Sequence, residues 1–172
     1  MYKLIGNRKE FAIQYEIAEI VDQFVYGYIC FWINGMQIGE LESGTIISDV
    51  LIFLPPIIKD NGNREHNIFF NMAKEEVYYL LGGQAYFDDV KYEEMALEET
   101  WARFNIKIGL DVFNNTVIKL IDNQKGSRIV FSNDNKVVYD FYLNKGTVDK
   151  VFIAFYNEFN GFYEEHVKKR LI

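Results

Sequence analysis

The feature that most constrains the fold is an apolar run at residues 25–33 that contains no charged residue. Successive side chains of an extended strand point to opposite faces, so this run places apolar side chains on both faces. Such a strand is typical of the middle of a sheet, or of a sheet covered on both sides. Asn34-Gly35 follows, and this pair accepts the positive φ angles of a type I′ turn. The sequence therefore predicts a central strand that turns tightly into another strand at residues 36–40.

The strand before this run is predicted from alternation. Residues 11–18 place apolar side chains at every second position, namely Phe11, Ile13, Tyr15 and Ile17. This period of two lays one apolar row along one strand face. Residues 11–40 are therefore predicted to form a first antiparallel meander. Gly27 interrupts the apolar pattern and marks a candidate β-bulge.

Two short helices are predicted after this meander. The first has apolar residues at helical spacing and is expected to begin at a Thr45 cap and to end at Pro55-Pro56, because proline lacks the backbone donor. Residues 60–63 have the composition of a turn. The second helix is expected to be capped by Asn71 and to end at Gly82-Gly83. Its apolar stripe consists of Ala73, Val77, Leu80 and Leu81.

A second antiparallel meander of four short strands is predicted in residues 104–143. Apolar and polar side chains alternate at residues 104–110, 118–120, 129–131 and 137–143. Asparagine-rich and glycine-containing breaks separate these segments, and such residues favour tight turns.

A long helix is predicted from about Thr147. Its apolar residues follow a three-four spacing that forms one stripe, which we expect to pack on a sheet. They are Val148, Val151, Phe152, Phe155, Phe159 and Phe162. The residues expected on the opposite, solvated face are Asp149, Lys150, Asn157, Glu158 and Glu164. The predicted fold class is thus α+β: one domain over residues 1–172, with an antiparallel sheet built from two meanders, packed against the long C-terminal helix with one or two shorter middle helices.

Composition limits the classes of function. The 172 residues are 49% hydrophobic, enough for a packed core, and the formal net charge is −7. This charge disfavours nucleic acids and anionic membranes as partners and favours a basic protein. The single cysteine, Cys30, excludes an internal disulfide and any multi-cysteine metal site. Neither a signal peptide nor an apolar run of roughly 18 residues is found, so we expect a cytoplasmic protein.

The sequence predicts no catalytic residue, no cofactor and no metal ion. It lacks the phosphate-binding, dinucleotide-binding, nucleophile-elbow and zinc-protease motifs. Cys30 is expected to be a buried, inert thiol, and Trp32 a core residue, whereas His66 and His166 are expected at the surface. Two further classes stay open: a small enzyme with paired carboxylates and a β-barrel carrier of a small ligand.

An acidic stretch is the main candidate for a binding surface. It contains Asp88, Asp89, Glu93, Glu94, Glu98 and Glu99, with Lys91 as the only counter-charge. Three interpretations are open: a solvated surface, a patch that binds a basic protein, and a cation site. Trp101 follows the stretch, and it is either an interface anchor or an anchor of this loop on its own domain.

Six segments resemble the immunity protein 42 family of bacterial polymorphic toxin systems. They are IGNRKEFAIQYEI, YGYICFWINGMQIGE, LESGTIISDVL, KDNGNRE, ARFNIKIGLDVF and VVYDFYLNKGTVDKVFIAFYNEFNGFYEE, and residues 29–35 are the most specific part. The resemblance implies a small intracellular protein, encoded beside a toxin gene, that binds and neutralises the cognate toxin domain. It transfers no catalytic or toxin-contact residue to this chain.

With this resemblance, the acidic stretch becomes a hypothesis for the inhibitory surface. The residues proposed to contact the toxin are Asp88, Asp89, Glu93, Glu94, Glu98 and Trp101. Many toxin domains are nucleases with basic clefts, and an acidic partner can imitate the phosphate backbone there. The rival hypothesis is a protein-interaction module unrelated to toxins.

Overall fold

The computed structural model describes residues 1–81, 101–134 and 136–170, which form two compact units. Unit 1 comprises Met1–Lys59, Ile108–Asn115 and Thr147–Ile172, and unit 2 comprises Asp60–Lys107 and Thr116–Gly146. Each unit has its own open antiparallel sheet, and a long C-terminal helix follows. The predicted α+β class is therefore confirmed, and the described strands do not close into the barrel of the carrier alternative. The assignment of one domain stays a prediction.

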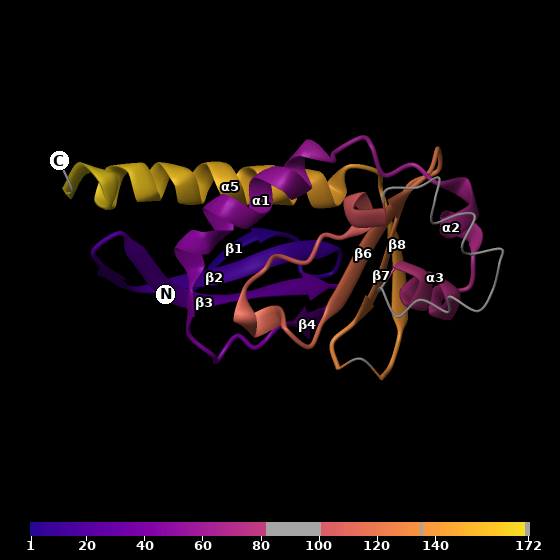
Figure 1. The fold of residues 1–172 in the computed structure, drawn as a ribbon, viewed down its shortest axis with the longest axis horizontal. Coiled ribbons are helices and arrows are strands. Elements are labelled where there is room, and N and C mark those ends of the chain that lie inside the picture. The colour runs from indigo at the N-terminus through magenta and orange to yellow at the C-terminus, as the bar shows by residue number, and fades with distance from the viewer. Residues whose placement is uncertain (82–100, 135, 171–172) are drawn as a thin grey trace. The chain divides into compact units, whose positions relative to one another are not determined.

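The sheet of unit 1 has the strand order β1 (Lys3–Gly6), β2 (Phe11–Val21), β3 (Phe24–Ile33) and β4 (Met36–Ile38) (Figure 1). A two-residue strand, β5 (Thr45–Ile46), also pairs with β3. The predicted first meander and the central position of β3 are confirmed. Asn34 and Gly35 have φ angles of 50° and 78°, as the predicted type I′ turn requires. Strand β1 was not predicted.

The β-bulge predicted at Gly27 is found in the neighbouring strand β2 and not in β3, the strand that contains Gly27. The register between β2 and β3 shifts between Ile17 and Glu19, and Ile17 is the residue that pairs with Gly27. A Cβ atom at Gly27 would lie 2.2 Å from the carbonyl oxygen of Glu16. Gly27 therefore lets the two backbones approach closely beside the bulge.

The long helix α5 (Thr147–His166) packs its apolar stripe on one face of this sheet. The Phe152 ring lies 5.3 Å from that of Phe11 and 5.7 Å from that of Phe31, measured between centroids. Both the helix and its stripe are thus confirmed. Asp149 is an exception, because it is only 3% exposed and not solvated. It lies in the first turn of α5, where the positive end of the helix dipole stabilises a carboxylate.

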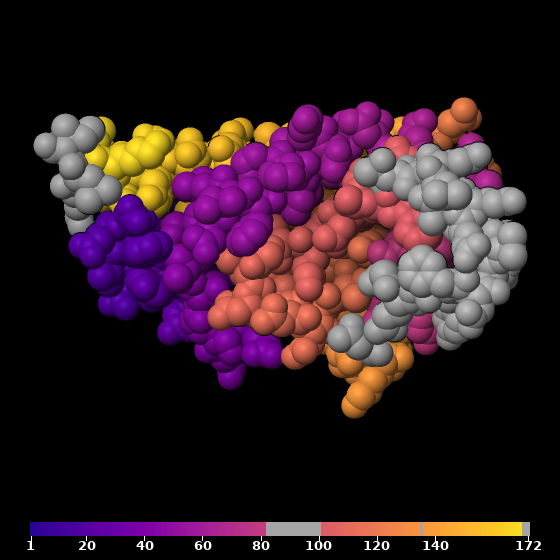
Figure 2. Space-filling view, in the orientation of Figure 1, coloured from indigo at the N-terminus to yellow at the C-terminus, as the bar shows by residue number. Residues whose placement is uncertain are grey.

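The first middle helix departs from the prediction at both ends. Thr45 lies in β5 and donates a hydrogen bond to Asp111 Oδ1 at 2.6 Å, so it caps no helix. A 3₁₀ turn, η1 (Ile47–Asp49), leads into α1 (Val50–Lys59), which contains both prolines. The helix continues through them because Leu54 and Ile57 are buried on either side, and this burial offsets the lost backbone hydrogen bonds. Figures 1 and 2 show α1 alongside α5.

The sheet of unit 2 has three strands in the order β6 (Val117–Asp122), β7 (Ser127–Ser132) and β8 (Tyr139–Leu143). The predicted fourth strand, at residues 104–110, is wrong. A 3₁₀ turn, η2 (Trp101–Phe104), is followed by a single bridge from Asn105 to Lys119. Phe104 and Ile106 are fully buried, so the alternating pattern correctly indicated which side chains are buried. No ladder forms because the chain leaves unit 2 at residue 108 and continues as part of unit 1 through the 3₁₀ turn η3 (Asp111–Phe113).

Two helices, α2 (Asn67–Asn71) and α3 (Lys74–Leu81), pack against the sheet of unit 2. The predicted stripe of α3 is confirmed at Val77, Leu80 and Leu81, which are buried, but Ala73 precedes the helix and is exposed. The predicted Gly82-Gly83 stop lies outside the described residues. The predicted Asn71 cap is wrong, because Asn71 is the last residue of α2 and α3 begins only at Lys74. The start of α2 is capped by His66: its Nδ1 accepts a hydrogen bond from the Phe69 N–H at 3.1 Å, and its ring stacks on that of Phe69. His66, which was expected at the surface, is half-buried and not fully exposed.

The last described element is the 3₁₀ turn η4 (Lys168–Arg170). In the part of the chain that the structure describes, no helix is both long and apolar enough to cross a membrane.

Candidate functional site

The sequence-predicted site divides into a described and an undescribed part. Asp88, Asp89, Glu93, Glu94 and Glu98 lie outside the described residues. Trp101 begins η2 and packs, partly buried, against the core of unit 2. Its indole Nε1 is buried and has no hydrogen-bond partner among the described residues. This packing agrees with an anchor of the loop on its own unit, and the contact of Trp101 with a toxin stays a prediction.

Cys30 has the inert environment that the sequence predicts. The residue is fully buried, and burial raises the pKa of its thiol to about 12. The thiol is therefore protonated at neutral pH and is a poor nucleophile. Cys30 lies on the face of the sheet opposite to α5, the helix that carries His166. Its neighbour on that face, Trp32, is only half-buried and donates to Gln14 Oε1 at 3.0 Å, so the expectation of a core tryptophan was too strong.

Acidic, histidine and cysteine side chains do not gather into a metal site within the described ranges, where no group of three or more could hold an ion. His166 is half-buried, with its Nδ1 3.1 Å from the carbonyl oxygen of Phe162 and its ring stacked on the Phe162 ring. Both histidines thus contribute to helix ends, His66 to the start of α2 and His166 to the end of α5.

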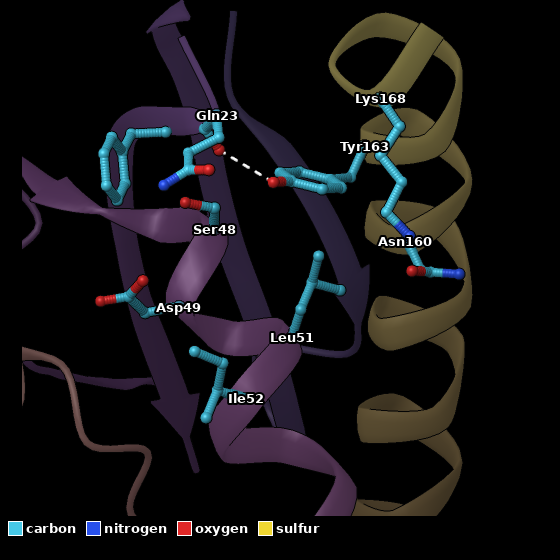
Figure 3. A pocket seen from close by; sticks show the side chains of 9 residues that line it. Gln23, Ser48, Asp49, Leu51, Ile52, Asn160, Tyr163 and Lys168 are labelled. Carbon is cyan, nitrogen blue, oxygen red and sulfur yellow. Dashed lines mark hydrogen bonds between the residues drawn. The ribbon is translucent and has the colours of Figure 1, made fainter. Parts of the chain in front are cut away.

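A groove of about 350 Å³ opens in unit 1 beside the turn between β2 and β3 (Figure 3). Three parts of the chain that are distant in sequence form it: the β2–β3 turn, the η1–α1 segment, and the end of α5 with η4. Its lining includes Phe24, Asp49, Leu51, Ile52, Tyr163 and Lys168. Its walls are mainly apolar, and polar groups stand among them, as in many protein-binding surfaces.

Hydrogen bonds between these elements hold the groove in shape. The Tyr163 hydroxyl donates to the carbonyl oxygen of Gln23 at 2.9 Å, which joins α5 to the β2–β3 turn (Figure 3). The backbone N–H of Val25 donates to Ser48 Oγ at 3.2 Å, which joins β3 to η1. Both walls are therefore fixed before any partner binds.

Large apolar side chains are left in solvent at this groove. Phe24 is 39% exposed and Ile52 is 69% exposed. Apolar groups exposed around a preformed groove are typical of interaction sites. This site was not predicted from the sequence. Its one local signal is the apolar Phe24, which lies between the predicted strands at residues 11–18 and 25–33.

A comparison with protein families matches the model of immunity protein 42 to residues 1–158. The chain belongs to the immunity protein 42 family. The resemblance found in the sequence segments is therefore confirmed, and it assigns this family member the role of an immunity protein that neutralises a toxin. Neither the unrelated interaction module nor the carboxylate enzyme gains support.

A solved structure has the same fold as this family member. The crystal structure of CdiI from Burkholderia dolosa AUO158 superimposes with a TM-score of 0.72 and 16% sequence identity. The match covers 91% of this chain and 99% of that chain. At this identity the likeness concerns the fold alone. No curated protein matches the chain.

Proposed function

We propose that this immunity protein neutralises its cognate toxin domain by covering part of the toxin's surface, without catalysing a reaction. Membership of the immunity protein 42 family is the observation that carries this proposal. The state of Cys30 supports the non-catalytic part, because a buried and protonated thiol offers no nucleophile. Co-expression with the product of the adjacent toxin gene, followed by pull-down, tests it. The expected result is a stable complex that also protects the cell, and toxin activity that is unchanged in the presence of the chain would contradict it.

The partner surface is proposed to be basic. The chain has a formal net charge of −7, and complementary potentials speed the encounter of two proteins and select the correct partner. A nuclease domain with a basic substrate cleft fits this requirement, and the complex would form in the cytoplasm of the producing cell.

The acidic stretch is the first surface proposed to contact the toxin. Its residues are Asp88, Asp89, Glu93, Glu94 and Glu98, with Trp101 next to them in sequence. Changing the first four together to Lys is expected to abolish protection of cells, because four attractive charges become repulsive.

A matched control separates this surface from net charge. Changing four other exposed acids to Lys alters the formal charge of the chain by the same amount; these are Glu19, Glu42, Glu75 and Glu165. Affinity for the toxin at physiological salt is the measurement. Equal losses in both variants would show that only net charge matters, and an unchanged affinity of the first variant would exclude the acidic stretch.

A further inference from the structure

We propose that the groove of unit 1 binds a basic side chain, Arg or Lys, presented by the surface of the toxin domain. This inference rests on the proposed function and adds a second contact surface, on unit 1, with a defined chemistry. Three observations carry it: the apolar walls, the balance of charge in the groove, and the fixed shape.

The apolar walls suit the stem of a long basic side chain. Phe24 and Ile52 both line the groove and expose apolar surface. Leu51 lies between Ile52 and α5 (Figure 3). Arg and Lys have methylene stems that pack on apolar surface while the charged group stays in contact with water. An occupant of this kind therefore matches the walls along its length.

The charge of the groove determines the sign of the occupant. Lys168 is the one cation among the described lining residues, and its Nζ lies 2.5 Å from Glu164 Oε1, so its charge is already paired. Asp49 also lines the groove, and its carboxylate has no hydrogen bond or ion pair with any described side chain. The unpaired charge is thus negative, and it attracts an ammonium or guanidinium group and repels a carboxylate.

The fixed shape makes the contact favourable once it forms. Tyr163 and Ser48 tie the walls of the groove together through their hydrogen bonds to Gln23 and Val25. A preformed site loses little conformational entropy on binding, and this benefit appears mainly as slower dissociation.

The test changes the sign of charge at one position of the groove. Ile52 is 69% exposed, so neither Lys nor Glu at this position disturbs the core. The Ile52→Lys variant is expected to weaken binding of the toxin domain encoded by the adjacent gene by at least about tenfold, because it places a cation beside the incoming cation. The Ile52→Glu variant is expected to bind within about threefold of wild type, because it adds attraction.

Ile68 supplies the matched control, since it is also an exposed helical isoleucine, with 59% of its surface exposed in α2 of unit 2. Ile68→Lys and Ile68→Glu change net charge by the same amounts as the two variants at Ile52. The measured quantity is the ratio of dissociation constants for Lys over Glu at each position. The inference requires a ratio at position 52 that is at least about threefold larger than at position 68.

Two outcomes overturn the inference while leaving the proposed function intact. Equal losses for Ile52→Lys and Ile52→Glu would show an apolar occupant or simple steric contact, and equal affinities for both would show that the groove is empty in the complex. Asp49→Asn is a second test, because it removes the negative charge that attracts the basic side chain. It is expected to weaken binding of the toxin domain about tenfold and to leave the melting temperature unchanged. If the wild-type chain itself does not bind the toxin, the proposed function fails, and the four variants need not be compared.

Discussion

The Tyr15 hydroxyl donates a hydrogen bond of 2.7 Å to Glu158 Oε1, which joins the middle of β2 to α5 across 143 residues of sequence. Lys3 Nζ, from β1, donates to the same oxygen at 2.9 Å. The Tyr15 residue is only 1% exposed, and its ring meets the rings of Phe155 and Phe159 edge to face. One carboxylate on the polar side of α5 thus holds two strands of the sheet.

Replacing Tyr15 by Phe is expected to lower the free energy of unfolding by about 1–2 kcal/mol, because it removes a hydrogen bond to a charged acceptor while keeping the ring. Urea unfolding measures the change. The control is Tyr156→Phe, which removes the hydroxyl of a half-buried tyrosine in α5. It is expected to change the free energy of unfolding by less than about 0.5 kcal/mol. Equal effects of both changes would show that the bond contributes nothing specific.

The pH dependence of stability is expected to report the charge of Glu158. Hydrogen bonds from Lys3 and then from Tyr15 hold the pKa of this carboxyl below its ordinary value of 4.5. A carboxyl with a lowered folded-state pKa stabilises the fold at pH values above its unfolded-state pKa. This contribution is lost as the pH falls through the folded-state value.

Comparing wild type with Glu158→Gln measures this contribution. The wild type is expected to be more stable near pH 7, and the difference in unfolding free energy is expected to shrink at about pH 3. Glu165→Gln, which removes an exposed glutamate of α5, is the control and is expected to change the unfolding free energy near pH 7 by less than about 0.5 kcal/mol. A difference for Glu158→Gln that stays constant down to about pH 3 would contradict the assigned role.

Two glycines in the first meander are expected to tolerate alanine very differently. Gly35 has a φ angle of 78° and open space around the position of a Cβ atom, so Gly35→Ala is expected to cost only about 1 kcal/mol of backbone strain. At Gly27 the new Cβ atom would lie 2.2 Å from a backbone oxygen, so β2 and β3 would have to separate. Gly27→Ala is expected to cost about 3 kcal/mol or more. Thermal unfolding compares the two, and the reverse order would show that the close approach at the bulge relaxes freely.

Replacing Arg128 is expected to destabilise unit 2 strongly. Its Nη1 donates to the carbonyl oxygens of Phe69, Phe70 and Met72 at 3.3, 3.0 and 2.7 Å, at the end of α2. Its Nη2 lies 2.9 Å from Asp140 Oδ2, and the side chain is 3% exposed. Arg128→Met leaves these buried acceptors without a donor and is expected to cost about 3 kcal/mol.

Lys125→Met provides the comparison, because Lys125 is an exposed cation of the same unit, in the turn between β6 and β7. Its expected cost is below about 0.5 kcal/mol. Denaturant midpoints that shift equally for the two variants would rule out the capping role of Arg128.

Local patterns in the sequence determined the elements that depend only on neighbouring residues. The alternation in residues 11–17, the Asn34-Gly35 turn and the stripe along α5 each follow from a backbone period and from the conformations open to one or two residues. The same local information suggested the immunity protein 42 family, through whole segments of sequence.

Tertiary structure alone decided the rest. A helix runs through Pro55 and Pro56 because Leu54 and Ile57 are buried in the core. Residues 104–110 bury alternate side chains without forming a strand, because the chain passes from unit 2 to unit 1 there. The groove of unit 1 brings together the turn at Gln23, the η1–α1 segment at Asp49 and the end of α5 at Tyr163, which lie far apart in sequence. No local pattern contains these contacts, because they are formed by packing and not by the conformational preference of any single segment.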